Sequence, residues 1–228
     1  MSSFAELLPG GDAQRVLWRV DDNAKSEVFL YLVSPAAPDL THLEEQAGWP
    51  TTPTWRTFEY DTFLSKLAKG DVWGFRLTAN PVHSIRRKDG EPTKVTAHIT
   101  PRHQMGWLLQ RQDAAGFRIV EKPHGQRRLP DGDDLELIVR DRRDRAFEKT
   151  DKADRSDGSE GSDRPDGSAR TAETGGARGR KNRVTLVTAT FDGRLEVTDP
   201  AALRRTLTAG LGRAKAYGCG LMTLAPVE

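Results

Sequence analysis

The chain has 228 residues, of which 30% are charged, yet its formal net charge at pH 7 is only +2. This even mixture of signs excludes a uniformly basic or acidic protein, so any binding function must come from local clusters. The single cysteine, Cys219, excludes an internal disulfide and favours a reducing, cytoplasmic compartment. The longest apolar run, Val28 to Val33, is too short to span a bilayer, and the first residues lack the basic segment of a secretory leader.

The first half of the chain predicts strands at 15–21, 27–34 and 72–79, a short helix at 40–47 and a longer helix at 60–69. In the longer helix, Asp61 is placed to cap the start and Gly70 to end it. The strand at 72–79 alternates apolar with polar or small residues, which is typical of a half-buried strand, and Asn80 with the following proline ends it.

The second half predicts strands at 94–99, 117–121, 135–141, 184–191, 195–197 and 221–225, and helices at 100–115 and 201–208. Thr100 followed by Pro101 is a favourable start for the first of these helices, and Gly116 is a favourable end. The dipeptide Asp192-Gly193 is a hairpin signal, so a turn is expected between the strands on either side of it.

A segment without apolar side chains separates two of these strands. Residues 150–182 consist almost throughout of Gly, Ser, Asp, Arg and Pro, with no Leu, Ile, Val or aromatic residue. Such a segment cannot bury enough apolar surface to offset the entropy of ordering it. We therefore expect a disordered insertion there.

The order of elements predicts an α+β protein built from two tandem α+β sandwiches. The second half supplies a β-α-β-β-α-β order that starts with the strand at 94–99. The first half lacks an initial strand and most of a first helix, which together would take about 20–30 residues. The sequence thus predicts a first domain that is incomplete at its start.

A glycine-rich stretch follows the last predicted helix. It has the pattern G-h-G-x5-G-h-G, where h is apolar, with its glycines at Gly210, Gly212, Gly218 and Gly220. Glycines let the backbone approach a ligand closely, and Arg213 and Lys215 between them add positive charge, which indicates a binder of anions or of a phosphate backbone. A P-loop is excluded because no Gly-Lys-Ser/Thr follows, and a dinucleotide-binding loop is disfavoured because this stretch follows a helix.

Three stretches carry a resemblance to a known family: VLWRVD at 16–21, FRLTANPV at 75–82 and the glycine-rich stretch at 210–226. They resemble the CasE subfamily of the repeat-associated RNA endonucleases of CRISPR systems, the crRNA-processing subunit of the type I-E Cascade complex. The resemblance implies two tandem ferredoxin-like (RRM-like) domains. We place them at 1–82 and 94–228, with a junction loop at 83–93 and the glycine-rich loop at 210–220.

The same resemblance implies the activity and the partners. The family binds a CRISPR repeat stem-loop RNA, the crRNA precursor, and cleaves it without a metal ion through the ribose 2′-hydroxyl. Other Cascade subunits are the implied protein partners, and neither a cofactor nor a metal site is expected.

One departure from the family concerns its acting histidine, which lies in the first helix of the first domain. The chain begins with MSSFAELL, which resembles the end of that helix, and no histidine precedes His42. The family's general acid/base therefore has no matching position. His83, close to Arg86, Arg87 and Lys88, is the best substitute, although a solvated loop histidine is the ordinary interpretation.

Beyond the four glycines, the candidate RNA-binding residues are Arg213, Lys215, Arg142, Arg143, Arg86, Arg87 and Lys88. Arg213 and Lys215 have a simpler alternative role, as a basic pair that complements a helix C-terminus. The arginines in RDRRDR at 140–145 have one as well, as part of a solvated hairpin with Asp141 and Asp144. Tyr217 is suited either to stacking on a base or to packing on the last strand.

Several residues with chemical potential are interpreted as packing residues. Trp18, Trp73 and Trp107 are expected in the core, and Cys219, between two glycines, is expected to be a small buried residue rather than a metal ligand.

Three functions are compatible with these observations. The first is a CasE-type endoribonuclease. The second is a non-catalytic subunit that binds repeat RNA or acts as a scaffold, which the missing histidine favours. The third is an unrelated nucleotide-binding enzyme that uses the glycine-rich loop, which binding of mononucleotides but not of stem-loop RNA would favour.

Overall fold

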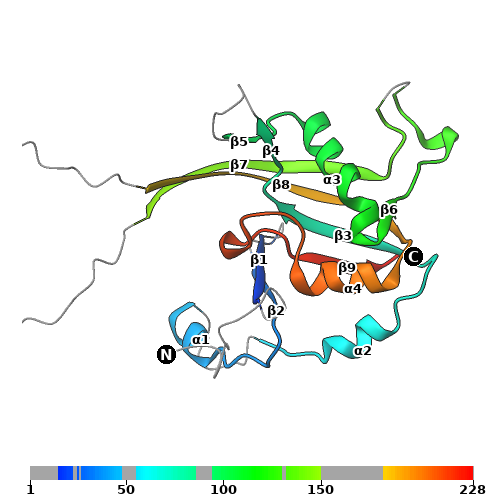
Figure 1. Cartoon of the computed structure of the whole chain (residues 1–228). Coiled ribbons are helices and arrows are strands. Elements are labelled where there is room, and N and C mark those ends of the chain that lie inside the picture. The colour runs from blue at the N-terminus through cyan, green and yellow to red at the C-terminus, as the bar shows by residue number, and fades with distance from the viewer. Residues whose placement is uncertain are drawn as a thin grey trace, which may run out of the picture. The chain divides into compact units, whose positions relative to one another are not determined.

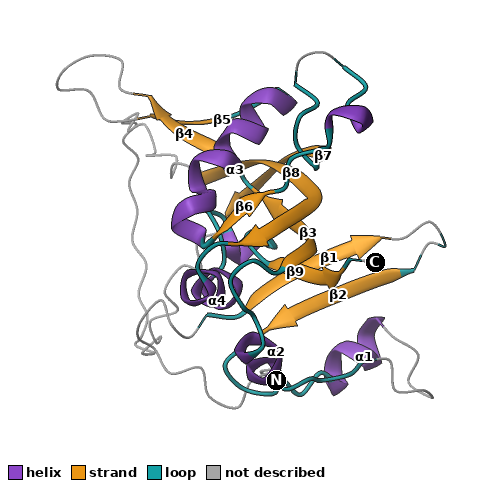
Figure 2. Ribbon diagram, turned by 90° about the vertical axis from the view of Figure 1, so that its right-hand side faces the viewer, coloured by secondary structure: helices purple, strands orange, loops and turns teal. Residues whose placement is uncertain are grey.

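The computed structural model describes residues 15–22, 25, 27–47, 55–85, 94–129, 132–149 and 182–227. Its main sheet is antiparallel, with the order β6-β8-β3-β9 and with β7 also paired to β8. These strands are β3 (Val72–Ala79), β6 (Phe117–Ile119), β7 (Leu137–Lys149), β8 (Asn182–Val197) and β9 (Met222–Pro226). The helices α3 (Pro101–Ala115) and α4 (Pro200–Ala209) lie together on one face of this sheet (Figures 1 and 2).

The remaining described elements are short. They are the paired strands β1 (Leu17–Asp22) and β2 (Val28–Val33), the paired strands β4 (Val82–Ile85) and β5 (Lys94–Ala97), the helices α1 (Thr41–Ala47) and α2 (Tyr60–Ser65), and the 3-10 turns η2 (His124–Gln126) and η3 (Lys215–Tyr217). Most predicted elements are thus confirmed at closely similar bounds. In the described part of the chain, no helix is long and apolar enough to cross a membrane.

The core forms between the main sheet and its two helices. Along β3, Phe75, Leu77 and Ala79 are buried and alternate with half-buried residues, as the sequence predicts. The side chains that meet them come from β6, β8, β9, α3 and α4, and include Trp107, Leu108, Phe117, Phe191, Leu195, Val197, Leu203, Leu207 and Met222. Full burial of each large apolar side chain contributes about 1.5–3 kcal/mol, so this cluster is the main source of stability.

The ends of α3 follow the local sequence. The Thr100 hydroxyl accepts a hydrogen bond from the backbone N–H of His103, and Pro101 follows it, so the predicted start is confirmed. Gly116 ends the helix at φ 84°, a conformation that favours glycine. A Cβ on Gly116 would lie 2.4 Å from the Asp199 carbonyl oxygen, so a side chain there would also collide with the start of α4.

The helix predicted at 60–69 starts where expected, but its predicted capping residue and its predicted end are wrong. α2 starts after Glu59, which makes no side-chain cap, and stops at Ser65 well before Gly70. The side chain of Arg204, on α4, donates hydrogen bonds to the backbone carbonyls of Leu64, Ser65 and Leu67. Because carbonyls of the last turn have this partner, the helix can end without a glycine cap.

The turn predicted at Asp192-Gly193 is also wrong, since both residues lie inside β8. Asp192 pairs in register with Arg76 on β3, and the two side chains form an ion pair of 2.6 Å. Gly193 is needed for a different reason, because a Cβ there would lie 2.2 Å from the Glu136 carbonyl oxygen. A glycine inside a strand marks such a close backbone approach.

The β-α-β-β-α-β order predicted for the second half is present, but its first strand is β3. The strand at 94–99 pairs only with β4, in a separate two-stranded sheet, whereas β3 lies between β8 and β9. In chain order β3, α3, β6, β8, α4 and β9 form a ferredoxin-like unit. The domain boundary at 83–93 stays a prediction, and this pairing favours a boundary before Val72.

Arg19 attaches the β1–β2 pair to the main sheet. Its side chain is 2% exposed and donates hydrogen bonds to the backbone carbonyls of Arg76 (2.9 Å) and Leu221 (3.1 Å) and to the hydroxyl of Thr223 (2.9 Å). Its remaining donors hold the carboxylate of Asp21 at 2.8 Å through two bonds. The guanidinium of β1 is therefore fixed by groups on β3, on β9 and just before β9.

Two predictions lie outside the described residues: the incomplete start of the first domain, since residues 1–14 are not described, and the insertion, of which only Asn182 is described, at the start of β8.

Replacement of Arg19 by methionine should lower the free energy of unfolding by about 3–5 kcal/mol, because it leaves the Asp21 carboxylate and two backbone carbonyls without their donors. Arg118→Met is the matched control, since Arg118 is 61% exposed and its ion pair among the described residues is with Glu196. An exposed pair contributes about 0–1 kcal/mol. Urea unfolding measures both, and equal losses in the two variants would contradict the role given to Arg19.

Candidate functional site

The glycine-rich loop connects α4 to β9 and has an unusual backbone. Gly210, Gly212, Gly218 and Gly220 all have positive φ, between 77° and 90°. Two hydrogen bonds fix the loop at its base, from Leu211 N to Gly220 O (2.9 Å) and from Gly220 N to Thr78 O (2.8 Å). The glycine pattern is therefore a requirement of this backbone path.

The close approach predicted for these glycines is made to the protein's own side chains. A Cβ on Gly212 would lie 2.9 Å from the Trp107 ring, and one on Gly218 would lie 2.8 Å from the Trp18 ring. A Cβ on Gly210 would lie 2.8 Å from Leu17. Packing thus explains the glycines without a ligand. Trp107 is in the core as predicted, whereas Trp18 is half-buried and lies against this loop.

The two basic residues of the loop differ in exposure. Arg213 is exposed, while its backbone forms a β-bridge with Asn80 at the end of β3. Within the described residues, no hydrogen bond or ion pair engages its guanidinium. Lys215 begins the turn η3 and is half-buried, and Tyr217 in the same turn is 37% exposed. Cys219, which follows, is fully buried, as predicted.

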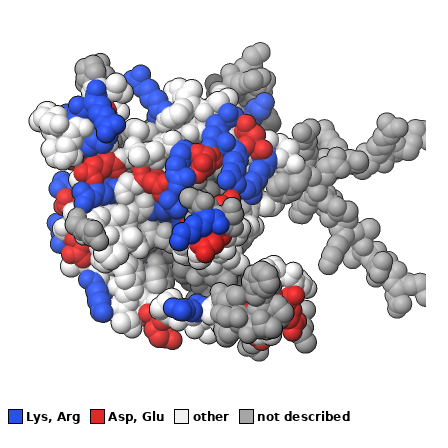
Figure 3. All heavy atoms as spheres, turned by 180° about the vertical axis from the view of Figure 1, so that it is seen from behind, with Lys and Arg blue, Asp and Glu red and all other residues white. Residues whose placement is uncertain are grey.

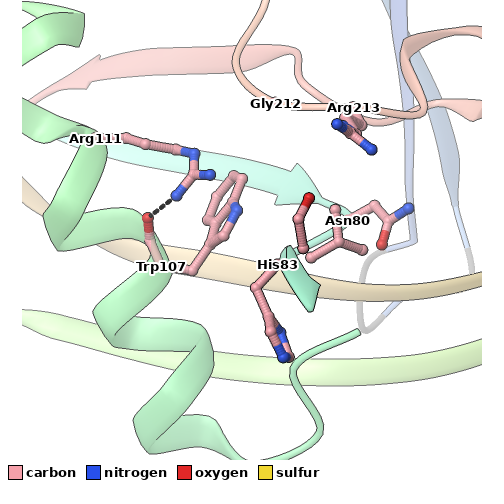
Figure 4. A pocket seen from close by; sticks show the side chains of 8 residues that line it. Asn80, His83, Trp107, Arg111, Gly212 and Arg213 are labelled. Carbon is pink, nitrogen blue, oxygen red and sulfur yellow. Dashed lines mark hydrogen bonds between the residues drawn. The ribbon is translucent and has the colours of Figure 1, made fainter. Parts of the chain in front are cut away.

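A small pocket of about 130 Å³ lies where the loop, α3 and β4 meet. Its lining residues are Asn80, Val82, His83, Ser84, Trp107, Arg111, Gly212 and Arg213. Figure 4 shows the guanidiniums of Arg111 and Arg213 on opposite sides of this pocket, with His83 below them. The structure therefore brings His83 and Arg213 together and adds Arg111, which the sequence gives no reason to select.

Arg111 is held by Trp107, one turn earlier on α3. Its side chain donates a hydrogen bond to the Trp107 carbonyl (2.9 Å), and its guanidinium lies 4.4 Å from the Trp107 ring centre (Figure 4). Burial and then the nearby positive charge of Arg213 lower the pKa of Arg111. Two like charges therefore share this site.

His83 belongs to a stack of three histidines. The ring centres of His83 and His98 are 4.4 Å apart, and those of His98 and His103 are 5.9 Å apart. Burial, followed by the charges of His83, His103 and Arg111, lowers the pKa of His98. The His83 Nδ1 atom is buried and has no hydrogen-bond partner in the described structure. His83 is thus a half-buried residue of β4, and the solvated-loop interpretation is wrong.

The arginines at 140–145 lie in β7, and Arg140, Arg142 and Arg143 form ion pairs. Arg140 contacts Asp192 and Asp141 at 2.5 Å, Arg142 contacts Asp144 at 2.7 Å, and Arg143 lies 3.9 Å from Asp22. Figure 3 shows Lys and Arg side chains interspersed with Asp and Glu on the face of the molecule opposite to the view of Figure 1. These pairs favour the solvated charged hairpin over a free basic surface. Arg86, Arg87 and Lys88 lie outside the described residues.

Replacement of Gly212 by alanine should lower the free energy of unfolding by more than Gly70→Ala does. Both positions have φ near +85° to +89°, which strains alanine by about 1–3 kcal/mol. Only at Gly212 would the new Cβ also meet the Trp107 ring. Gly106→Ala is a control of opposite sign, since Gly106 is inside α3 with open space around it, and alanine should stabilise that helix by about 0.5–1 kcal/mol. Thermal unfolding ranks the variants, and equal losses at Gly70 and Gly212 would contradict the packing argument.

The histidine stack should make stability depend on pH. Because the pKa of His98 is lowered from 6.5 on folding, the unfolded chain binds its proton more readily. The associated stability is present above pH 6.5 and is lost as the pH falls through the lower folded value. His98→Gln should therefore flatten the decrease in melting temperature on the acid side, whereas His124→Gln, outside the stack, should not. The same slope in wild type and His98→Gln would contradict this prediction.

Comparisons with known proteins agree with this geometry. The sequence model of the family described as CRISPR associated protein matches residues 1–226. The CRISPR-associated endoribonuclease Cse3 of Thermus thermophilus is 29% identical over 214 residues, which cover 93% of this chain and 81% of the relative.

Solved structures share the fold. Thermus thermophilus Cse3, bound to an RNA that represents a pre-cleavage complex, matches with a TM-score of 0.60 and 23% identity over 93% of this chain and 79% of that one. A chain of a CRISPR RNA-guided surveillance complex matches with a TM-score of 0.51 and 18% identity, over 99% of this chain and 85% of that one. These similarities confirm the α+β class with tandem ferredoxin-like domains. Since the family model spans nearly the whole sequence, the chain belongs to the CRISPR-associated protein family, in its CasE subfamily.

Proposed function

We propose that this chain binds the stem-loop of CRISPR repeat RNA, cleaves the crRNA precursor and stays with the product in the Cascade complex. The family assignment supports this, as do the similarities to an endoribonuclease, to an RNA-bound structure and to a surveillance complex. The observation that carries the proposal is the Arg213 guanidinium, which is exposed on a loop of fixed conformation and engages no described acidic group.

The ion pairs rank the candidate RNA contacts. An arginine that already holds a carboxylate, such as Arg142 with Asp144, must give up that partner before it binds a phosphate. Arg213 has no such partner to lose among the described residues, and Lys215 is close to it in the same loop. We therefore place the main phosphate contacts in the glycine-rich loop, with Arg142 and Arg143 as secondary contacts.

Cleavage without a metal needs a base for the 2′-hydroxyl, an acid for the leaving oxygen and positive charge near the phosphorane. Arg111 and Arg213 are suited to the third role. His83 lines the same pocket and is the candidate for proton transfer. In this mechanism a neutral His83 removes the 2′-hydroxyl proton, the oxygen attacks the adjacent phosphorus, the bond from phosphorus to the 5′-oxygen breaks, and a 2′,3′-cyclic phosphate remains. The leaving 5′-oxygen takes its proton from solvent water, and the proton on His83 returns to solvent.

A second function remains in contention because of the orientation of His83. Its ring stacks on His98, and Figure 4 shows it pointing away from the two guanidiniums. This position favours a subunit that holds the repeat RNA without cleaving it.

One experiment separates the two functions. The chain is incubated with its cognate repeat RNA in EDTA, and binding, cleavage rate and product ends are measured together. Cleavage to a 2′,3′-cyclic phosphate end supports the endoribonuclease, and His83→Asn should then slow it by about 10²–10⁴-fold. His124→Asn, outside the pocket, should leave the rate unchanged. Tight binding without cleavage would support the non-catalytic subunit, and an absence of specific binding would overturn both.

A further inference from the structure

The pocket between α3 and the glycine-rich loop has a charge that the described residues do not balance. We propose that Arg111 and Arg213 together clamp a single phosphate group, which in the bound state is one phosphodiester of the RNA backbone. This inference rests on the proposed function only in naming RNA as the molecule that supplies the phosphate. Binding of a phosphate group in this pocket can be tested without RNA.

The first argument is the contrast with other arginines of the described structure. Several of them face a carboxylate, in the pairs Arg19–Asp21, Arg76–Asp192, Arg118–Glu196, Arg140–Asp192, Arg142–Asp144 and Arg194–Glu136. Arg111 instead donates to a neutral carbonyl, and its described charged neighbour is another arginine. Two guanidiniums without an acidic partner repel each other, and a bound anion removes that repulsion.

The second argument is that the Arg111 guanidinium and the backbone of Arg213 are positioned before any ligand binds. Arg111 lies on the Trp107 ring, which is 2% exposed and stacks on Phe191 with ring centres 5.9 Å apart. The edge of that ring lies against the backbone of Gly212, where a Cβ would lie only 2.9 Å away. Arg213 comes directly after Gly212, and its backbone is bridged to Asn80. Since the backbone on each side is fixed, less ordering entropy is lost on binding.

The third argument is size and chemistry. The volume of about 130 Å³ is below the roughly 300–1,000 Å³ of pockets for larger ligands, so a phosphate group fits better than a whole nucleotide. Guanidinium donors match phosphate oxygens in geometry, and two of them can hold one phosphate from both sides. The hydroxyl of Ser84, also in the lining, is a further donor.

The pocket is tested first with inorganic phosphate alone. At constant ionic strength, phosphate should raise the melting temperature of the wild type above its value in chloride. Arg111→Gln and Arg213→Gln should each abolish this rise, and the double variant should lose no more than either single one. Arg118→Gln, whose arginine pairs with Glu196 on the sheet, is the control and should keep the full rise. In chloride, Arg213→Gln should melt at or above the wild-type temperature, because the repulsion is removed.

The second test uses the repeat stem-loop and the salt dependence of its affinity. Loss of one phosphate contact reduces the slope of log K against log salt by about 1. If both arginines hold the same phosphate, each single variant and the double variant should show that same reduction. A double variant with twice the reduction would overturn a shared phosphate.

The outcomes also separate this inference from the proposed function. A phosphate-dependent rise that both glutamine variants lose supports the pocket, even if the chain does not bind repeat RNA. No rise in the wild type, or a rise that persists in Arg111→Gln and Arg213→Gln, overturns the pocket whatever the RNA experiments give.

Discussion

The guanidinium of Arg19 is the constraint on which the described architecture depends. A buried cation is tolerated only when its donors are satisfied, and here its hydrogen bonds reach Asp21, two backbone carbonyls and Thr223. Loss of one of these groups would leave charge or donors unsatisfied in a dry environment. The position of β1 relative to β3 and β9 is therefore determined by hydrogen-bond geometry as well as by apolar packing.

This constraint extends to the glycine-rich loop through the neighbours of Arg19. Leu17 and Trp18, on the same strand, are the side chains that Gly210 and Gly218 approach most closely. From the other side Trp107 contacts Gly212. The loop is thus held between β1 and α3, so the backbone of Arg213 has a defined position although this residue belongs to no helix or named strand. An electrostatic site gains most from such preorganisation, because little reorganisation is needed when charge arrives.

Sequence signals predicted the helices and strands well where residues adjacent in sequence determine them. The start of α3 at Thr100-Pro101 and its end at Gly116 depend on neighbouring residues only, and both are correct. The turn predicted at Asp192-Gly193 is absent because residues far away in sequence determine the conformation there. Arg76 and Arg140 donate hydrogen bonds to the Asp192 carboxylate. The Glu136 carbonyl lies close to Gly193. Burial raises the pKa of Asp192, but the hydrogen bonds from both arginines outweigh that effect and lower it. A sequence pattern contains no information about such partners.

The site was predicted in part for the same reason. The glycine spacing and Arg213 are adjacent in sequence and could be recognised together, whereas Arg111 reaches the pocket only through the packing of α3. The histidine stack depends on the pairing of β4 with β5, which places His83 opposite Thr96 and brings His98 near it. His83, His98 and His103 belong to no recognisable motif in the sequence, so the sequence does not indicate that their rings stack. The glycines as RNA contacts stay a prediction, whereas their close approach to tryptophan and leucine side chains is a feature that the sequence did not indicate.

The central position of β3 has a consequence for how the chain matures on the ribosome. β3 is synthesised before both of its neighbours, and the pairings Leu77–Phe191 and Leu77–Met222 join residues far apart in sequence. Until β8 and β9 have emerged, both edges of β3 expose unpaired N–H and C=O groups, which can pair with other chains. Contacts of such long range also slow folding. At least one edge of β3 therefore stays unpaired while α3, β6, β7, β8 and α4 are synthesised. The second edge is paired only when β9 has emerged.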